Sequence, residues 1–235
     1  QLAAEYETIA QAAQHDRWAN LLRRAGLTDE QTDDVLASDA YGALSAELRR
    51  AEANHHDLDA MLPRLIQART LDDAADIASV IHHRVERATT RPVGSGRTRK
   101  PARLIVGLIP EAGGLMAAEM RQALDERADL IESRADAVLD AAIQDHQPWV
   151  AALGPIPKDP RTQRVWRQHA NLVAAYRDRY RVPARHPIGT DSDSAAQRID
   201  AARAKTALVQ AQRSTSREPG RSSRPSPVRT PGRTL

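Results

Sequence analysis

The chain has 235 residues, of which 28% are charged, and it carries a formal net charge of +3 and no cysteine. The lack of cysteine excludes a disulfide framework and thiolate metal sites. No apolar run approaches the roughly 20 residues that a membrane-spanning helix needs, so we expect a cytoplasmic protein with no membrane insertion. Alanine and arginine are abundant and both favour helices, so we expect an all-α fold with no β-hairpin.

The positive charge is concentrated at the C-terminal end of the chain. Residues 213–235 contain six Arg and one Glu, a net charge of +5, which leaves residues 1–212 at −2. This segment is rich in Ser, Pro and Gly and has almost nothing apolar to bury, so we expect a disordered basic tail. At the other end, Gln1 opens directly into a helical pattern, and we expect a fragment or processed piece of a longer product.

Residues 1–88 predict a helical region built from short helices. Thr28 and Gln31 fit a capping box at the start of one helix, and Gly26 fits the end of the helix before it. Pro63 predicts a break or a kink in the helix around it, because proline lacks a backbone N–H and crowds the preceding turn.

A further helix is expected to begin at Thr70, which fits the capping pattern together with Asp73. Its expected apolar face consists of Leu71, Ala74, Ile77, Ile81 and Val85. Adjacent helical side chains point about 100° apart, so His82 and His83 cannot both bind one metal ion. We expect His82 and Glu86 to form an exposed pair instead.

Residues 89–110 predict a basic linker rich in Pro and Gly, followed by a short extended segment. The run G-S-G-R-T-R-K at 94–100 lacks the spacing of a Walker A phosphate loop. Basic side chains in such a linker are suited to contact nucleic-acid phosphates. The candidates for this contact are Arg97, Arg99, Lys100 and Arg103. Leu104–Ile109 is apolar and rich in β-branched residues, and we expect it to lie extended against the core.

Residues 111–182 predict a long antiparallel helical hairpin. Its first helix spans about 114–146, a length of roughly 48 Å. After a short turn, Asp159 and Pro160 fit the N-cap and the first residue of the second helix. The face that this helix is expected to bury carries Val165, His169, Leu172, Val173, Tyr176 and Tyr180. A loop and a terminal helix follow within 183–212. The apolar residues expected in that last helix are Ile199, Ala202, Leu208 and Val209.

Aromatic residues cluster in the hairpin. The chain has three Trp, four Tyr and no Phe, and four of these seven lie between Pro148 and Tyr180. They are Trp149, Trp166, Tyr176 and Tyr180. We interpret them as structural or interface anchors that form the hairpin core, and base stacking by exposed rings is the alternative.

An acidic stripe follows one side of the long helix at steps of four, three, four and four residues. Its members are Asp125, Asp129, Glu132, Asp136 and Asp140. Like charges at this spacing destabilise an isolated helix, so a basic partner is expected. Our hypothesis is that the stripe is closed by the basic tail, transiently, or by three arginines of the next helix: Arg161, Arg164 and Arg167. The alternative is a solvated face screened by salt.

Several phrases of the sequence are informative beyond their periodicity. They are R-W-A-N-L-L-R-R-A-G-L-T-D-E-Q at 17–31, L-R-R-A-E-A at 48–53, H-D-L-D-A-M-L-P at 56–63, L-D-D-A-A-D at 71–76, I-H-H-R at 81–84, G-L-I-P-E-A at 107–112, M-R-Q-A-L-D-E-R at 120–127 and the P-W…A-A-Y-R-D-R-Y block at 148–180. Together they resemble the C-terminal region of actinobacterial conjugative relaxase-helicases of the TrwC/TraA type (MobF class). The matching phrases extend over about residues 1–190.

The resemblance implies a role in plasmid DNA transfer without catalysis by this chain. Members of the family nick DNA with a tyrosine and a His-rich metal site and unwind it with Walker motifs, and no residue here matches either set. ATP and a divalent metal are therefore implied for the parent domains alone. No catalytic, cofactor-binding or metal-binding residue and no cofactor is expected in this segment.

The expected function is thus that of a non-catalytic accessory region following the helicase. It would contact single-stranded plasmid DNA weakly or dock a conjugation coupling or transfer protein. The DNA contact would use the linker cations and the tail arginines Arg217, Arg221, Arg224, Arg229 and Arg233. The alternative is a helical protein-protein interaction scaffold with no nucleic-acid role, and an independent enzyme is disfavoured because no convergent polar site can be argued.

Overall fold

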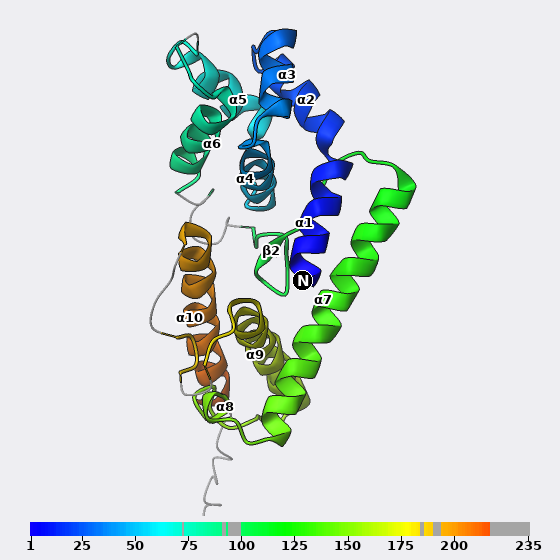
Figure 1. The fold of residues 1–235 in the computed structure, drawn as a ribbon. Coiled ribbons are helices and arrows are strands. Elements are labelled where there is room, and N and C mark those ends of the chain that lie inside the picture. The colour runs from blue at the N-terminus through cyan, green and yellow to red at the C-terminus, as the bar shows by residue number, and fades with distance from the viewer. Residues whose placement is uncertain (72, 91–92, 94–99, 184–185, 190–193, 217–235) are drawn as a thin grey trace, which may run out of the picture.

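The computed structural model describes residues 1–71, 73–90, 93, 100–183, 186–189 and 194–216. The described part forms ten helices and one pair of two-residue strands, which confirms the all-α fold (Figure 1). None of the helices within these ranges is long and apolar enough to cross a bilayer. Most of the expected basic tail lies outside the described residues, but Arg213–Ser216 continue the last helix.

Six helices precede the linker. They are α1 (Leu2–Ala13), α2 (His15–Arg24), α3 (Asp29–Ala37), α4 (Tyr41–Ala53), α5 (Leu58–Gln67) and α6 (Ile77–Ala88). The linker is followed by β1 (Leu104–Ile105), β2 (Ile109–Pro110), α7 (Ala118–Gln144), α8 (Pro148–Ala151), α9 (Pro160–Tyr180) and α10 (Ala195–Ser216). The long helix α7 therefore begins four residues later than Gly114, where the sequence placed its start.

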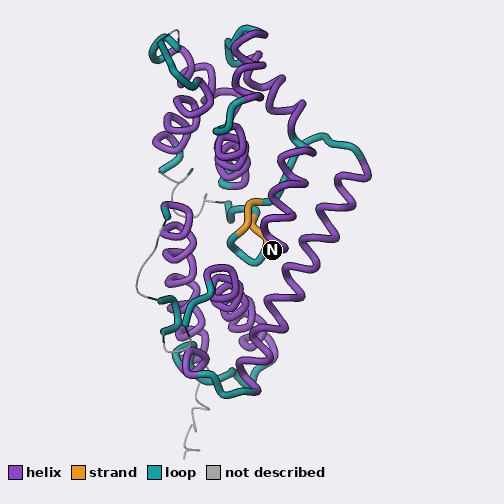
Figure 2. Tube along the Cα trace, viewed as in Figure 1, coloured by secondary structure: helices purple, strands orange, loops and turns teal. Residues whose placement is uncertain are grey.

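The apolar side chains form two separate cores. One is built by residues 18–85 and fills the space between α2, α3, α4, α5 and α6 around Trp18 and Leu48. The other joins α1 to the hairpin strands and to α7, α8, α9 and α10. Helix α1 runs beside α7 in both ribbon views, and its Tyr6 belongs to this second core (Figures 1 and 2). The two helical regions therefore pack together, with α1 crossing from one to the other.

The start signals of α3 are confirmed, whereas that of α6 was placed wrongly. Thr28 and Gln31 form the capping box of α3, and Gly26 turns the chain with a φ of +112°. Helix α6 begins at Ile77 with Asp76 as its N-cap, and not at Thr70 and Asp73. The Asp76 carboxylate accepts hydrogen bonds from Ala78 N and from the Ser38 hydroxyl, at 3.0 and 2.9 Å. This contact with the α3–α4 turn explains why the later cap is used.

Pro63 does not break its helix, because α5 is continuous from Leu58 to Gln67. The missing proline N–H deprives the Asp59 carbonyl of its helical partner. Asp59 is exposed, so water can solvate that carbonyl.

A small β-hairpin follows the linker, contrary to the expectation that the chain has none. Leu104 pairs with Pro110 and Ile105 with Ile109 in an antiparallel register. The expected contact of this segment with the core is confirmed, since Ile105, Leu108 and Ile109 are buried. Figure 2 shows the strands in the middle of the molecule, next to the start of α1.

The turn of the hairpin requires glycine. Gly107 has a φ of +72°, and a Cβ at this position would lie 2.5 Å from Leu172 Cδ1 of α9. The residue thus combines a left-handed backbone with a close approach to a neighbouring helix, and both conditions disfavour a side chain.

The second hairpin helix, α9, begins as expected, and its buried face matches the expected one in part. Asp159 is its N-cap, accepting from Thr162 N at 2.8 Å, and Pro160 is its first residue. Val165 is 46% exposed, and the buried face is centred on Trp166, Val173 and Tyr176. On α7 the buried residues are Leu124, Ile131, Ala135, Leu139 and Ala142.

The terminal helix α10 packs against α9 through residues that only partly match those expected. Its buried residues include four alanines: Ala201, Ala204, Ala207 and Ala211. Ile199 and Val209, which were expected to be buried, are 38% and 41% exposed. Small side chains allow two helix backbones to approach closely, so the alanine face contacts α9. Ile199 and Val209 point outward, whereas Leu208 packs partly buried against the core.

Candidate nucleic-acid interface

The aromatic residues of the hairpin are core anchors. Trp149, Trp166 and Tyr176 are at most 4% exposed. The Trp166 indole donates to the Leu153 carbonyl at 3.2 Å. Base stacking needs an accessible ring face, so the stacking alternative is excluded for these three rings. Tyr180 is partly buried, and its hydroxyl donates to Asp200 Oδ2 at 2.8 Å. Burial raises the pKa of Tyr180.

The acidic stripe is closed at its C-terminal end by Arg167. This side chain bonds to Asp136 Oδ1 at 3.0 Å and to Asp140 at 2.8 Å. The two carboxylates raise the pKa of Arg167, and Asn171 adds a bond of 2.8 Å to Asp136. The hypothesis that arginines of the next helix close the stripe is therefore confirmed for Arg167, one of the three proposed residues.

The N-terminal end of the stripe has a different environment. Asp125, Asp129 and Glu132 are exposed and form no ion pair with any residue that the structure describes. Arg161 and Arg164 are likewise exposed and form no such pair within the described ranges. They lie in the first turns of α9, which faces the C-terminal end of α7, so they cannot reach this part of the stripe.

Most of the predicted DNA-contact residues cannot be placed. Arg97, Arg99, Arg217, Arg221, Arg224, Arg229 and Arg233 lie outside the described residues. Lys100 and Arg103 are described and exposed. Arg103 lies near Glu52, since a Cβ added to Gly113 would be 3.3 Å from both Arg103 Nη2 and Glu52 Oε2. Glu52 already forms an ion pair with Arg17, so Arg103 is part of a mixed-charge cluster.

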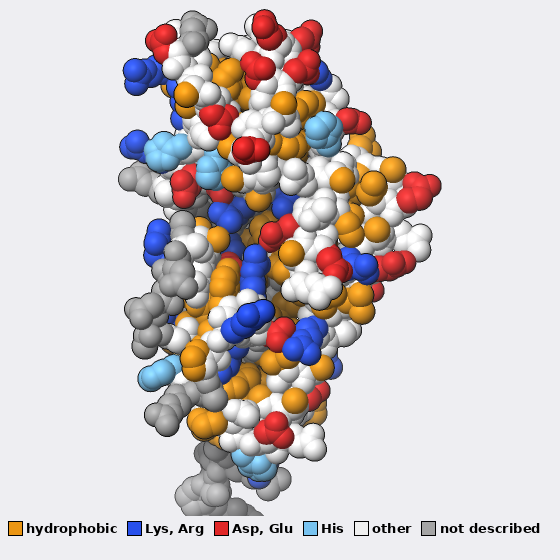
Figure 3. All heavy atoms as spheres, viewed as in Figure 1, with side chains coloured by type: hydrophobic (Ala, Val, Ile, Leu, Met, Phe, Trp, Pro, Cys, Tyr) orange, Lys and Arg blue, Asp and Glu red, His pale blue; other side chains and the backbone are white. Residues whose placement is uncertain are grey.

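A second group of arginines, which sequence reasoning missed, lies where the two cores meet. Arg179 bonds to Glu7 at 3.0 Å, and Asp200 lies 3.8 Å from Arg179 and 3.7 Å from Arg203. These contacts tie α1, α9 and α10 together. Figure 3 shows Lys and Arg side chains gathered in the hollow at the middle of this face. No periodic pattern marks them, because the partners come from distant parts of the sequence.

Arg49 of α4 is the most buried cation near this junction. It is 2% exposed, and its Nε and Nη1 atoms have no hydrogen-bond partner among the described residues. Burial lowers the pKa of Arg49, and the nearby Glu7 opposes that change. A phosphate group of a nucleic acid cannot reach so buried a side chain, and the residue is not a DNA contact.

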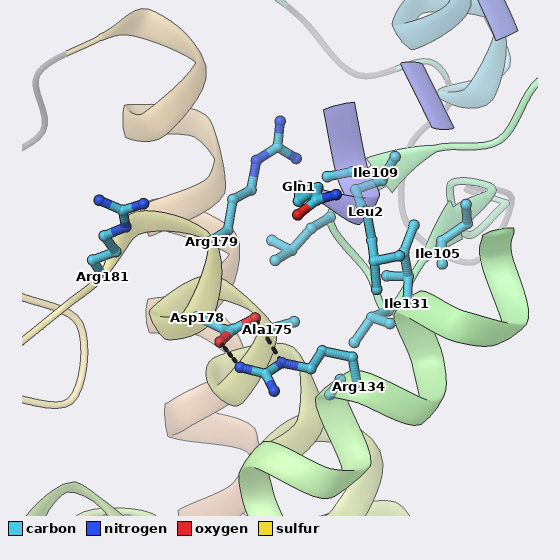
Figure 4. Close-up of a pocket in the computed structure, with 14 residues that line it drawn as sticks. Gln1, Leu2, Ile105, Ile109, Ile131, Arg134, Ala175, Asp178, Arg179 and Arg181 are labelled. Atoms are coloured by element: carbon cyan, nitrogen blue, oxygen red, sulfur yellow. Dashed lines mark hydrogen bonds and ion pairs between the residues drawn. The ribbon is translucent and has the colours of Figure 1, made fainter. Parts of the chain in front are cut away.

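A pocket of about 520 Å³ opens beside the junction (Figure 4). Its apolar wall includes Leu2, Ile109 and Ile131. At its rim Arg134 reaches across from α7 to bind Asp178 of α9 at 2.7 Å. Arg179 of α9 and Arg181, the residue after its end, also line the pocket.

No protein-family model matches the chain, and no curated protein or solved structure is significantly similar to it.

Proposed function

We propose that the chain is a non-catalytic accessory region of a conjugative relaxase-helicase that acts in plasmid DNA transfer and contacts single-stranded DNA weakly. The observation that carries the DNA contact is the division of charge. Residues 1–212 carry a net charge of −2, whereas the last 23 residues carry +5. Many arginines of the helical body are occupied within it, among them Arg17, Arg167 and Arg179.

The contact is electrostatic and independent of sequence. Each phosphate neutralised on a single strand contributes about −0.7 to the slope of log K against log salt concentration. The five arginines from Arg217 to Arg233 therefore account for a slope of about −3.5. Such binding is strong at low salt and falls steeply as salt is added.

The test is fluorescence anisotropy of a labelled single-stranded oligonucleotide across a salt series. The chain is compared with a full-length variant in which those five arginines are replaced by glutamine. A variant carrying Arg161→Gln and Arg164→Gln controls for loss of exposed charge on the helical body. We expect the tail variant to lose most of the salt slope. An unchanged slope in that variant contradicts the proposed contact.

Docking of a conjugation coupling or transfer protein is the second candidate function. It is favoured by the exposed end of the acidic stripe, where Asp125, Asp129 and Glu132 form no ion pair with any residue that the structure describes. A row of carboxylates without cationic partners suits a basic partner surface. Binding of a transfer protein that survives the five tail substitutions, and is lost on Asp129→Lys with Glu132→Lys, supports this function.

A further inference from the structure

An open groove between α5 and α6 differs in charge from the rest of the helical body. It has a volume of about 730 Å³. Its apolar part is formed by Leu65, Ala68, Val80 and Ala88, and its basic part by Arg69, His83, Arg84 and Arg87. No Asp or Glu is among the described residues that line it. Figure 3 shows basic side chains along the edge of the molecule over α5 and α6, with Asp and Glu side chains among them.

The cations of the groove have different roles. Arg84 is held in place, because its guanidinium donates to the carbonyls of Leu65 at 2.7 Å and Arg69 at 3.2 Å. It thereby supplies hydrogen bonds to carbonyl groups at the C-terminal end of α5, which have no partner within the helix. His83 is exposed and lies 3.8 Å from Glu86, so this pair forms in place of the expected pair of His82 and Glu86.

Arg69 and Arg87 are the available cations. Both are exposed, and neither forms an ion pair with a residue in the described ranges. They lie at the two helix ends that border the groove, one just after α5 and the other in the last turn of α6. Arginines free of carboxylate partners bind phosphate oxygens directly, because no existing ion pair has to be broken first.

The sequence that follows α6 is also basic. Five basic residues follow α6 within the linker: Arg91, Arg97, Arg99, Lys100 and Arg103. A ligand that contacts both Arg69 and Arg87 must carry negative charge at more than one point along its length. Single-stranded nucleic acid does so, and the uncharged faces of its bases and sugars suit the apolar part of the groove.

We propose that the α5–α6 groove is a second contact site for single-stranded DNA, in which Arg69 and Arg87 bind backbone phosphates. The site rests on the proposed function and places part of the DNA contact on the folded body. No Trp, Tyr or Phe is among the described residues that line the groove, so we expect binding there to discriminate little between bases.

The experiment measures anisotropy of labelled oligodeoxythymidine with the full chain, with an Arg69→Ala and Arg87→Ala variant, and with an Arg161→Ala and Arg164→Ala control. The control removes the same charge from exposed positions of α9. Loss of two phosphate contacts reduces the salt slope by about 1.4, and this corresponds to about 25-fold weaker binding at 0.1 M salt. The control is expected to change affinity less than threefold. Arg69→Lys with Arg87→Lys is expected to keep the slope.

The possible outcomes separate the two proposals. If the Arg69 and Arg87 substitutions weaken binding no more than the control substitutions do, the groove is not a DNA site. The proposed contact through the tail is unaffected by that result. No binding by the unmodified chain at low salt overturns both. Oligoglutamate of equal charge is the second probe. If it binds as tightly as the DNA and loses as much affinity in the variant, the groove takes acidic peptides and the nucleic-acid assignment is wrong.

Discussion

Replacing Arg177 by methionine tests how much one buried arginine stabilises the protein through its hydrogen bonds to the loop that follows α9. The side chain is 7% exposed. It donates to the carbonyls of Val182 and Pro183 at 3.1 Å, to Pro187 at 2.9 Å and to His186. Its guanidinium also lies 4.8 Å from the centre of the Trp149 ring. Methionine keeps the aliphatic volume and removes every one of these donors.

The expected loss follows from the number and quality of these bonds. A hydrogen bond to a charged group contributes about 1.5–3 kcal/mol. The contributions of the four hydrogen bonds cannot simply be added. Burial of the charged guanidinium costs free energy, as the lowered pKa of Arg177 indicates, and methionine avoids that cost. Pro183 and His186 are exposed, so water can replace two of the four bonds. We therefore expect the Arg177→Met substitution to lower the free energy of unfolding by about 3 kcal/mol, or the melting temperature by about 6–12 °C.

The assay is thermal and urea unfolding followed by circular dichroism. Arg177→Lys is expected to lose most of the same stability, because one ammonium cannot reach four carbonyls in a fork. Arg167→Met on the same helix is the matched control, with an expected loss of about 0.5–1 kcal/mol for exposed ion pairs. If Arg177→Met costs no more than Arg167→Met, the carbonyl cluster does not hold the loop as described.

Two further substitutions test local features of the fold. Asp76→Ala removes the cap of α6 and the bond to Ser38, and we expect a loss of about 1–2 kcal/mol at neutral pH. Hydrogen bonds from Ser79 and other groups lower the pKa of Asp76 in the folded protein below its usual value of 3.8. The contribution of Asp76 to the free energy of unfolding is therefore complete above pH 3.8 and disappears as the pH falls through the lowered folded-state pKa. Urea unfolding from pH 7 to pH 2 checks this, and an Asp76→Ala deficit that stays constant to pH 2 refutes it. Gly107→Ala should cost about 2 kcal/mol, part backbone strain and part contact with Leu172. The double variant with Leu172→Ala should recover the contact part, and strict additivity in a double-mutant cycle would show that the contact is absent.

Local signals in the sequence predicted local structure well. The capping box of α3 and the Asp159–Pro160 start of α9 involve residues three or fewer positions apart, so their geometry is decided within one turn of chain. Asp76 shows the limit of such signals. Thr70 and Asp73 also fit a capping pattern. The helix begins after Asp76 instead, because the Asp76 carboxylate bonds to Ser38, a residue 38 positions away in the sequence.

The buried faces of helices were predicted less well, because hydrophobicity is a weak guide where alanine dominates. In α10 the larger residues Ile199 and Val209 suggested one face, while close approach to α9 selects the alanine face. The Arg69 and Arg87 groove was missed for another reason. Its two sides come from α5 and α6, and their packing is a tertiary arrangement that neither helix encodes alone.

The crossing of α1 between the two cores has a consequence for how the protein is made. Residues 18–85 contain everything needed for their own core, so they can fold as soon as α6 has left the ribosome. Tyr6 and Ala10 of α1 precede that segment, yet their apolar neighbours lie beyond residue 104. Helix α1 must therefore wait through the synthesis of more than a hundred residues before it is covered. This high sequence separation makes docking of α1 a late and slow folding step.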